Sequence, residues 1–237
     1  MILRVFASFV AIFALSACGL SQSPTTPAAQ NSTKGTGSYP NSTYVMTQSK
    51  PLEPAVFGGA DSKVKLSIFT DYQCPACGVF HRSIEDKLWK SYIDTGRVTA
   101  TFYNFPLTFD VAAGGPLHPN AEGDALASLC ALSAGKFREY RDGLYALENA
   151  AFQAKKNGKS VSDGERIELA RKVGISDVAD FEKCLVGARY QKTLESEIAE
   201  GVRSRVNGTP TILINGAQVQ YDSPEQFFTI LDGAVGK

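Results

Sequence analysis

The stretch FTDYQCPACGVF, residues 69–80, places two cysteines where one sequence pattern gives way to another. The residues before it, KVKLSIF at 63–69, alternate and then become continuously apolar, which is typical of a strand that enters a covered sheet. From Pro75 to Ile93 the apolar positions follow helical spacing. We therefore expect Cys74 at the junction of a strand and a helix, and Cys77 one turn inside that helix.

This placement predicts different chemistry for the two sulfurs. At the N-cap, Cys74 faces the unpaired N–H groups of the first turn and the positive end of the helix dipole, and both favour thiolate. Thiolate is the nucleophile in disulfide exchange, and Pro75 suits the first helical position because it has no N–H. We expect Cys74 to hold a mixed disulfide and Cys77 to resolve it.

Two other interpretations of the pair compete with a reactive dithiol. A purely structural disulfide would close a very short loop and add little stability. A zinc site could recruit Asp71 and His81, but no second Cys/His pair completes a four-ligand set. We expect no metal and no other cofactor, and we expect His81 to be an exposed or lightly hydrogen-bonded residue near the site.

The rest of the chain supplies the other parts of a sheet-and-helix domain. RVTATFYNF, residues 97–105, predicts a second strand, so that strand, helix and strand form a βαβ unit with a parallel pair. Residues 119–205 carry helical patterns only. TPTILING, residues 209–216, predicts a strand that turns through an Asn-Gly pair into AQVQY, and Ser223 begins a last helix.

The N-terminal residues predict export. Arg4 is the only charge before an apolar run of 13 residues, long enough for a signal peptide and too short to span a bilayer. LSAC, residues 15–18, resembles a bacterial lipobox, which implies removal of residues 1–17 and a lipid on Cys18. A plain signal peptide with a chance cysteine is the alternative.

The expected organisation follows from this. Residues 18–49 form the lipidated cysteine and a flexible tether, because their Ser-, Thr-, Gly- and Pro-rich composition cannot bury enough apolar surface. Residues 50–118, 119–205 and 206–237 are the N-terminal half, the helical region and the C-terminal half of one domain. Lys+Arg and Asp+Glu both count 24, which gives no reason to expect nucleic-acid binding.

The remaining cysteines lie in the helical region, where Ser162 and Glu165 have capping-box spacing and Ser176 can cap the next helix. Because an exported protein can keep disulfides, we expect a bond between Cys130 and Cys184. Two buried free thiols, or a second redox centre that passes electrons to the first pair, are the alternatives.

Several motifs together carry a resemblance to a known family. It rests on FTDYQCPACGVF, NFPL, HPNAEGDALASLCA, FEKCL and VNGTPTILING, in this order and at fitting distances. They resemble the DsbA-like thioredoxin-fold oxidoreductases, in the branch that includes the BdbD-like extracellular proteins, from about Glu53 to the C-terminus.

The resemblance implies an α/β thioredoxin fold whose βαβ and ββα halves are separated by a helical insertion, residues 119–205. It also implies that Pro210 is cis after Thr209 and packs beside the Cys74–Cys77 pair, leaving backbone groups free to pair with an extended substrate. His118 is expected to order the start of the insertion rather than to perform catalysis.

Two positions depart from the family pattern or add little to it. Relatives often carry a buried acid six residues before the first cysteine, where this chain has Ile68, so Asp71 or a water would have to accept the proton. Ala76, between the cysteines, offers neither charge nor a donor. The pKa of Cys74 should therefore depend on the helix terminus and the backbone, between roughly 3.5 and 7.

These features predict a monomeric, lipid-anchored thiol–disulfide oxidoreductase on the extracytoplasmic or periplasmic side of the cell envelope. It would oxidise cysteine pairs in other exported proteins and be reoxidised by a membrane partner of the DsbB or VKOR kind. A reductase or isomerase is the alternative within the same fold. A chaperone-like binding lipoprotein and a metal-binding lipoprotein are the alternatives outside it.

Overall fold

The computed structural model describes residues 52–108, 117–153 and 161–236, all within one compact unit, Tyr44–Lys237. The predicted signal peptide, Cys18 and the tether, residues 1–49, lie outside the described residues. Within the described ranges, no helix combines the length and apolar character needed to cross a membrane.

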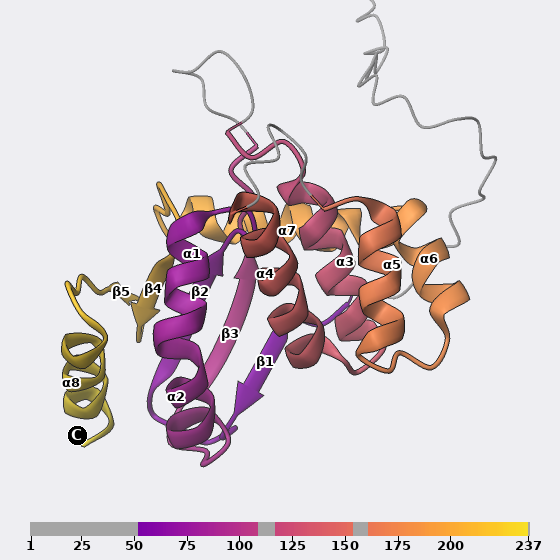
Figure 1. Ribbon diagram of the computed structural model, residues 1–237. Helices are drawn as coiled ribbons and strands as arrows, with labels where there is room; N and C mark the ends of the chain where they lie inside the picture. The colour runs from indigo at the N-terminus through magenta and orange to yellow at the C-terminus, as the bar shows by residue number, and fades with distance from the viewer. Residues whose placement is uncertain (1–51, 109–116, 154–160, 237) are drawn as a thin grey trace, which may run out of the picture. The chain divides into compact units, whose positions relative to one another are not determined.

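A mixed sheet of five strands forms the centre of the unit, in the order β1-β3-β2-β4-β5 (Figure 1). Its strands are β1 (Ala55–Gly58), β2 (Lys65–Thr70), β3 (Thr99–Asn104), β4 (Thr211–Ile214) and β5 (Ala217–Gln218). The central pair β2 and β3 is parallel, as the sequence predicts, and β4 joins β2 antiparallel. Strand β1, antiparallel to β3, was not predicted because four residues on a sheet edge give little periodicity.

The helix after β2 has the predicted bounds, Pro75 to Ile93. It consists of α1 (Pro75–Phe80), the π-helical turn η1 (His81–Glu85), α2 (Asp86–Leu88) and the π-helical turn η2 (Trp89–Ile93). Its apolar side packs with the sheet and with α8 (Pro224–Val235) into one buried cluster. Two aromatic contacts join the helices, with ring centroids 6.3 Å apart for Phe80–Phe227 and 5.5 Å for Tyr92–Phe228.

The insertion is helical throughout its described residues and lies between β3 and β4 in the chain. It comprises α3 (Ala121–Ser133), α4 (Phe137–Gln153), α5 (Asp163–Lys172), α6 (Val178–Val186) and α7 (Gln191–Arg203). The capping box at Ser162 and Glu165 is confirmed. The predicted cap at Ser176 is wrong, because the carboxylate of Asp177 accepts the N–H of Asp180 at 2.9 Å and starts α6 one residue later.

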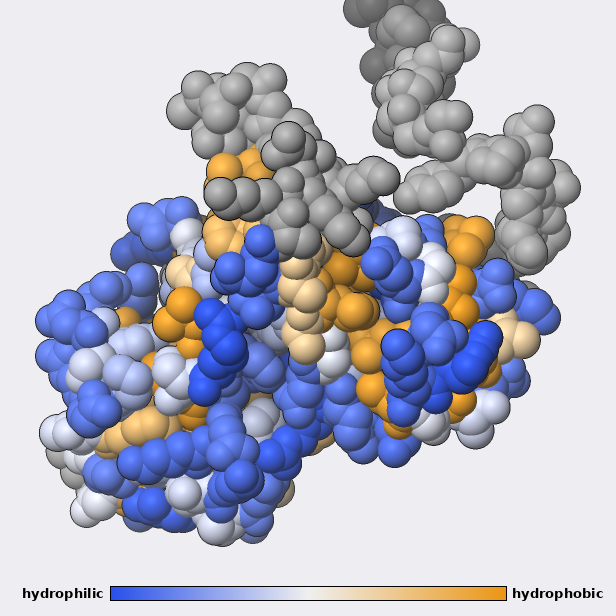
Figure 2. Space-filling model, in the orientation of Figure 1, coloured by the Kyte–Doolittle hydropathy of each residue, from blue (hydrophilic) through white to orange (hydrophobic). Residues whose placement is uncertain are grey.

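The C-terminal half closes the sheet with the predicted hairpin. Asn215 and Gly216 have positive φ values of 50° and 83°, as a tight two-residue turn requires. Only Ala217–Gln218 of the predicted second strand pairs with β4. The order βαβ, helical insertion, ββα is the α/β architecture that the resemblance implies. On the face that Figure 2 shows, hydrophobic residues reach the surface only in patches.

Candidate active site

Cys74 and Cys77 meet at the end of β2 and the start of α1. Cys74 is the N-cap residue, with extended backbone angles of −71° and 119°, and Pro75 follows at the first helical position. The exposed fraction is 7% for Cys74 and 0% for Cys77, and both thiols are free. The difference in exposure makes Cys74 the sulfur that an incoming group reaches first.

The surroundings of the two sulfurs separate their acidities. A hydrogen bond with the Cys77 thiol is the main cause that lowers the pKa of Cys74 to about 5, with help from Thr209 and from backbone N–H groups of Ala76 and Cys77. Burial raises the pKa of Cys77 well above its ordinary value. One sulfur is thus a stable thiolate at neutral pH and the other a protonated donor beside it.

The loop before β4 completes the site. The peptide bond between Thr209 and Pro210 is cis, and the carbonyl oxygen of Thr209 accepts a hydrogen bond from Cys74 Sγ at 3.2 Å. A groove of about 600 Å³ opens beside this loop, lined by Ala76, Val79 and Tyr221 among others. Val79 is 54% exposed, so the groove offers apolar surface next to the reactive sulfur.

Asp71 holds the turn that delivers Cys74. One carboxylate oxygen accepts the Gln73 N–H at 2.8 Å, and the other accepts the Leu107 N–H at 2.8 Å and lies 2.7 Å from His118 Nδ1. The backbone N–H of Asp71, not its carboxylate, points to Cys77 Sγ at 3.5 Å. The carboxylate considered as a proton acceptor is therefore already engaged by other donors.

Of the two settings expected for His81, exposed or lightly hydrogen-bonded, the structure shows a hydrogen-bonded side chain. Its side chain is 15% exposed, its Nδ1 lies 2.8 Å from Glu85 Oε2, and its ring stacks on Tyr145 with centroids 4.5 Å apart. Burial would raise the pKa of Glu85, but the charge of Arg141 and the hydrogen bonds with His81 and Arg141 outweigh it and lower the pKa to about 2. In the part of the chain that the structure describes, no cluster of His, Cys, Asp and Glu could hold a metal.

Arg141 is a neighbour of the site that could not be predicted from the sequence. It is 1% exposed, and its Nη2 forms an ion pair with Glu85 Oε1 at 2.5 Å. Its Nη1 donates a hydrogen bond to Thr70 Oγ1 at 3.2 Å. This pair joins α4 of the insertion to the helix that carries the cysteines. A buried arginine in an amphipathic helix looks like a solvent-facing one in sequence, so only the packing reveals it.

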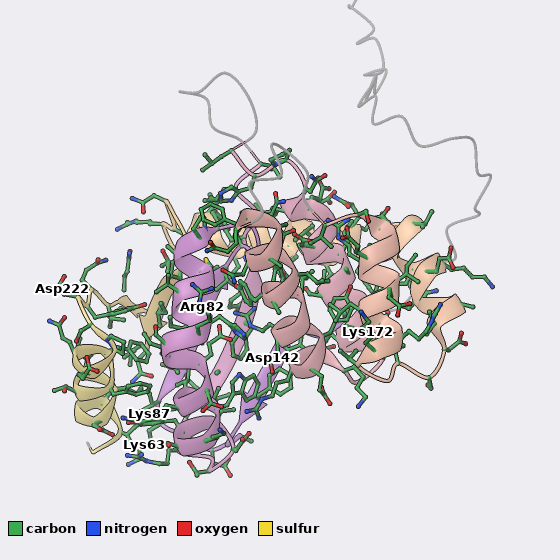
Figure 3. All side chains as sticks on the ribbon, viewed as in Figure 1. Lys63, Arg82, Lys87, Asp142, Lys172 and Asp222 are labelled. Carbon is green, nitrogen blue, oxygen red and sulfur yellow. A yellow bond between two sulfur atoms is a disulfide. The ribbon has the colours of Figure 1, made fainter. Side chains whose placement is uncertain are left out.

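A second, smaller cleft lies on the insertion side of Cys74. It has a volume of about 150 Å³ and is lined by Cys74, Tyr145, Glu148 and Phe152 together with Arg82. Arg82, labelled in Figure 3, contacts the side chain of Asn149 across the cleft at 3.4 Å. The reactive sulfur is thus flanked by a groove on one side and a narrow cleft on the other.

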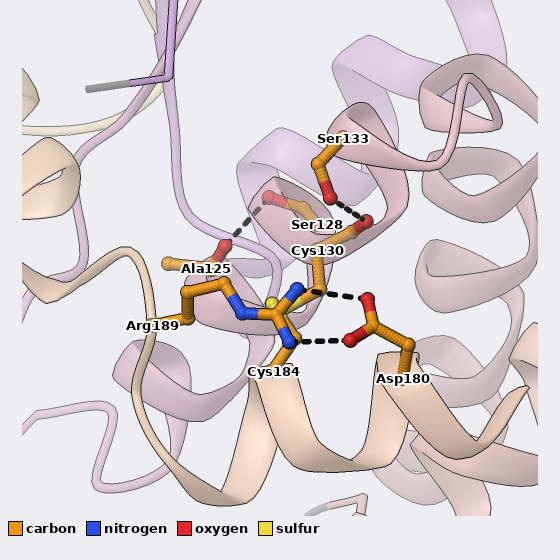
Figure 4. The surroundings of a disulfide bond; sticks show 7 residues. All are labelled: Ala125, Ser128, Cys130, Ser133, Asp180, Cys184 and Arg189. Atoms are coloured by element: carbon orange, nitrogen blue, oxygen red, sulfur yellow. Dashed lines mark hydrogen bonds and ion pairs between the residues drawn. A yellow bond between two sulfur atoms is a disulfide. The ribbon is translucent and has the colours of Figure 1, made fainter. Parts of the chain in front are cut away.

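The other two cysteines form a disulfide within the insertion. Cys130 in α3 and Cys184 in α6 are bonded at 2.03 Å (Figure 4). Both are buried, at 2% and 1% exposure, in the apolar cluster of the insertion. An ion pair of Arg189 with Asp180 lies beside them, with a shortest distance of 2.6 Å.

Comparisons with known proteins extend over most of the chain. A family model described as thioredoxin matches residues 51–233. The chain is 25% identical over 171 residues to the probable disulfide bond formation protein D of Bacillus anthracis, covering 70% of this chain and 72% of that protein. It is also 25% identical over 162 residues to disulfide bond formation protein D of Bacillus subtilis, covering 68% of this chain and 67% of that protein.

Solved structures share the fold. Oxidised BdbD from Bacillus subtilis has a TM-score of 0.66 at 21% identity, over 78% of this chain and 94% of that one. Reduced DsbA from Mycobacterium tuberculosis has a TM-score of 0.59 at 21% identity, over 78% of this chain and 93% of that one. The predicted architecture, a sheet with a helical insertion, is thereby confirmed.

Proposed function

The chain belongs to the thioredoxin family and is a thiol–disulfide oxidoreductase of the DsbA and BdbD type, and we propose that it introduces disulfides into exported proteins through Cys74 and Cys77. The observation that carries the proposal is the setting of Cys74. It caps a helix, lies under the Thr209 carbonyl and has a pKa of about 5 beside a Cys77 whose pKa is raised.

The proposed exchange has a definite order. In the oxidised enzyme, a substrate thiolate attacks Cys74 Sγ, the Cys74–Cys77 bond breaks, and Cys77 leaves and takes up a proton. A second substrate thiolate then attacks the substrate sulfur of the mixed disulfide, and Cys74 leaves as thiolate. Two electrons pass from the substrate to the enzyme, so that one disulfide forms in the substrate while the Cys74–Cys77 disulfide is reduced. The low pKa of Cys74 makes it a good leaving group in the second step.

The same acidity favours oxidation over reduction. A thiolate stabilised in the reduced form lowers the free energy of that form and so makes the disulfide a stronger oxidant. This supports the oxidant over a reductase or isomerase of the same fold. It also supports an enzyme over a chaperone-like module, which has no use for a thiolate beside an open groove.

The substrate site we propose is the groove beside the cis Pro210. Its exposed Val79 and the loop at Thr209 suit an extended chain that adds main-chain hydrogen bonds while presenting a cysteine to Cys74. Pro75 and Ala76 complete the site as supports without charge.

The location and partners belong to the same proposal. Lipid on Cys18 would hold a monomer at the extracytoplasmic or periplasmic face of a membrane, on a tether of residues 18–49. A membrane oxidant of the DsbB or VKOR kind would then take two electrons from the reduced pair and restore the disulfide. The folded parts, residues 50–118, 119–205 and 206–237, would act as one domain beyond the tether.

Mixing the oxidised full chain with a reduced peptide that contains two cysteines tests the function. We expect one peptide disulfide for each enzyme disulfide consumed, measured by mass spectrometry after acid quench. An enzyme that leaves the peptide reduced, yet in reduced form cleaves an oxidised peptide to completion, would be a reductase. If neither reaction occurs, the binding-module interpretation replaces the enzyme.

A further inference from the structure

The start of the insertion is tied to the turn that leads into Cys74. His118 Nδ1 lies 2.7 Å from Asp71 Oδ2, and the Asn120 N–H donates to Gln73 Oε1 at 3.0 Å. Both bonds cross from the insertion to residues 71–73, which continue directly into Cys74. The position of the reactive cysteine therefore depends on this connection.

The connection also brings together opposite charges in a buried place. The side chain of Asp71 is 0% exposed and that of His118 is 13% exposed. Asp71 contacts the dithiol through its backbone, because its N–H points to Cys77 Sγ at 3.5 Å. Its carboxylate is on the same residue. An uncompensated carboxylate there would disfavour a second negative charge on Cys74.

Three acidic groups from different elements raise the pKa of His118. They are Asp71 in the turn after β2, Cys74 at the start of α1 and Glu148 in α4. The hydrogen bond with Asp71 is the largest cause of a raised pKa for His118, and it outweighs the burial that lowers it. His118 thus keeps its proton to higher pH than a free imidazole does.

We propose that His118 is a positioning residue for the dithiol: it holds the Asp71 turn that presents Cys74 and, when protonated, offsets the charge of the Asp71 carboxylate in that turn. Pro75 and Ala76 carry no charge, so the positive charge is supplied by His118, directly before the insertion, rather than from within the Cys-x-x-Cys stretch. The inference deepens the proposed function and rests on it for its catalytic meaning, since a stabilised Cys74 thiolate makes the disulfide more oxidising.

Reciprocity gives a test that needs no mutation. If His118 stabilises the Cys74 thiolate, that thiolate must raise the pKa of His118 by the same free energy. The chain has two histidines, so both imidazoles can be followed by NMR titration in the reduced and the oxidised full chain. We expect oxidation to lower the pKa of His118 by roughly half a unit to one unit. Equal values for His118 in both redox states would overturn the proposal.

Two variants separate the charge from the hydrogen bond. His118→Gln keeps a donor without charge, whereas His118→Lys keeps the charge, and His81→Gln is the matched control for loss of an imidazole beside a carboxylate. In His118→Gln we expect alkylation of Cys74 at pH 4.5 to slow about threefold to eightfold, because the thiolate fraction of Cys74 falls. We also expect the equilibrium with glutathione to shift toward the Cys74–Cys77 disulfide by up to about tenfold, or about 30 mV.

His118→Lys should stay near the unaltered chain on both measures, and so should His81→Gln. If Gln and Lys change both measures alike, or if Gln lowers only the melting temperature, the role is structural and the proposal fails. Alkylation and the NMR titration need no protein substrate. A chain that forms no disulfides in other proteins would therefore contradict the proposed function without deciding the role of His118.

Discussion

The two cysteine pairs of this chain have similar burial and different chemistry. Cys74 and Cys77 are 7% and 0% exposed, and Cys130 and Cys184 are 2% and 1% exposed. The first pair is free and lies at a helix N-terminus beside a groove, whereas the second is bonded and lies within two helices of the insertion. Burial therefore does not decide the reactivity of a cysteine here. The neighbouring Cys77 thiol, the backbone N–H groups of the helix terminus and the access from the groove decide it.

The local contacts show the same contrast. The Cys77 thiol and the Thr209 side chain both lie beside Cys74 Sγ, and both lower the pKa of Cys74. Around Cys130 and Cys184 the polar contacts engage the backbone instead, as in the bond from Ser133 Oγ to the Cys130 carbonyl at 2.8 Å. Polar groups near the first pair change the pKa of a sulfur, whereas Ser133, near the second pair, hydrogen-bonds a helix carbonyl.

The largest expected effect comes from removing one sulfur of the first pair. Cys74→Ser should abolish oxidation of a reduced two-cysteine peptide, because the sulfur that forms the mixed disulfide is gone. In Cys77→Ser the Cys74 thiolate should instead form a mixed disulfide with an oxidised peptide and retain it, since the resolving thiol is missing. Mass spectrometry of the trapped species measures both. Equal activity in Cys74→Ser and the unaltered chain would erase the distinction between the pairs.

Removing the second pair should affect stability instead. The Cys130–Cys184 bond spans a sequence separation of 54 residues, so replacing both cysteines by alanine should cost about 4 kcal/mol of unfolding free energy, as chain entropy implies. Urea denaturation measures the loss, and peptide oxidation well below the melting temperature should be unchanged. Lost activity in a folded double variant would mean that this pair also carries electrons.

Of the two cysteine pairs, only the first should contribute to the pH dependence of stability. The pKa of Cys74 is lowered to about 5 in the folded protein and is roughly 8.5 in the unfolded chain. Ionisation of Cys74 therefore stabilises the folded, reduced protein fully above roughly pH 8.5, and this stabilisation is lost as pH falls toward 5. Cys77 acts in the opposite sense above roughly pH 8.5, because its raised pKa lets the unfolded chain ionise first.

The difference between the denaturation midpoints of the reduced and the oxidised protein isolates the effect of Cys74 and Cys77 ionisation on stability. The difference should move in favour of the reduced form from pH 5 to about 8.5 and decline beyond. Cys74→Ser should flatten the rise between pH 5 and 8.5. A difference that is independent of pH in the unaltered chain would contradict the assignment of the thiolate.

The smallest effect is expected beside the second pair. Arg189→Ala removes the ion pair with Asp180, whose side chain is 54% exposed, and should cost about 0.5 kcal/mol or less. Urea denaturation should show this small loss, and the state of the Cys130–Cys184 bond should not change. Reduction of that bond by glutathione in the variant would show that charge tunes the second pair as well.

The sequence predicts most of the fold because its signals are local. The helix from Pro75 to Ile93, the parallel strand pair and the hairpin at Asn215 all follow from periodicity, caps or turn residues over a few positions. The placement of Cys74 at the N-cap follows from the same local pattern.

The contacts between distant segments could not be predicted in this way. Arg141 reaches Glu85, and His118 reaches Asp71, only after the insertion has packed against the first half of the domain. Strand β1 needs β3 as its partner to be recognisable. The pKa of about 5 for Cys74 falls in the expected range, but its largest cause is the Cys77 thiol rather than the helix terminus.

One titration tests the contrast between the two pairs most directly. The full chain is equilibrated in a series of glutathione ratios, quenched with an alkylating agent, and both pairs are quantified by mass spectrometry. We predict that Cys74–Cys77 is half reduced at a potential between roughly −120 and −180 mV, while Cys130–Cys184 stays oxidised to below about −300 mV. A value near −270 mV for Cys74–Cys77, or reduction of Cys130–Cys184 first, would contradict the account.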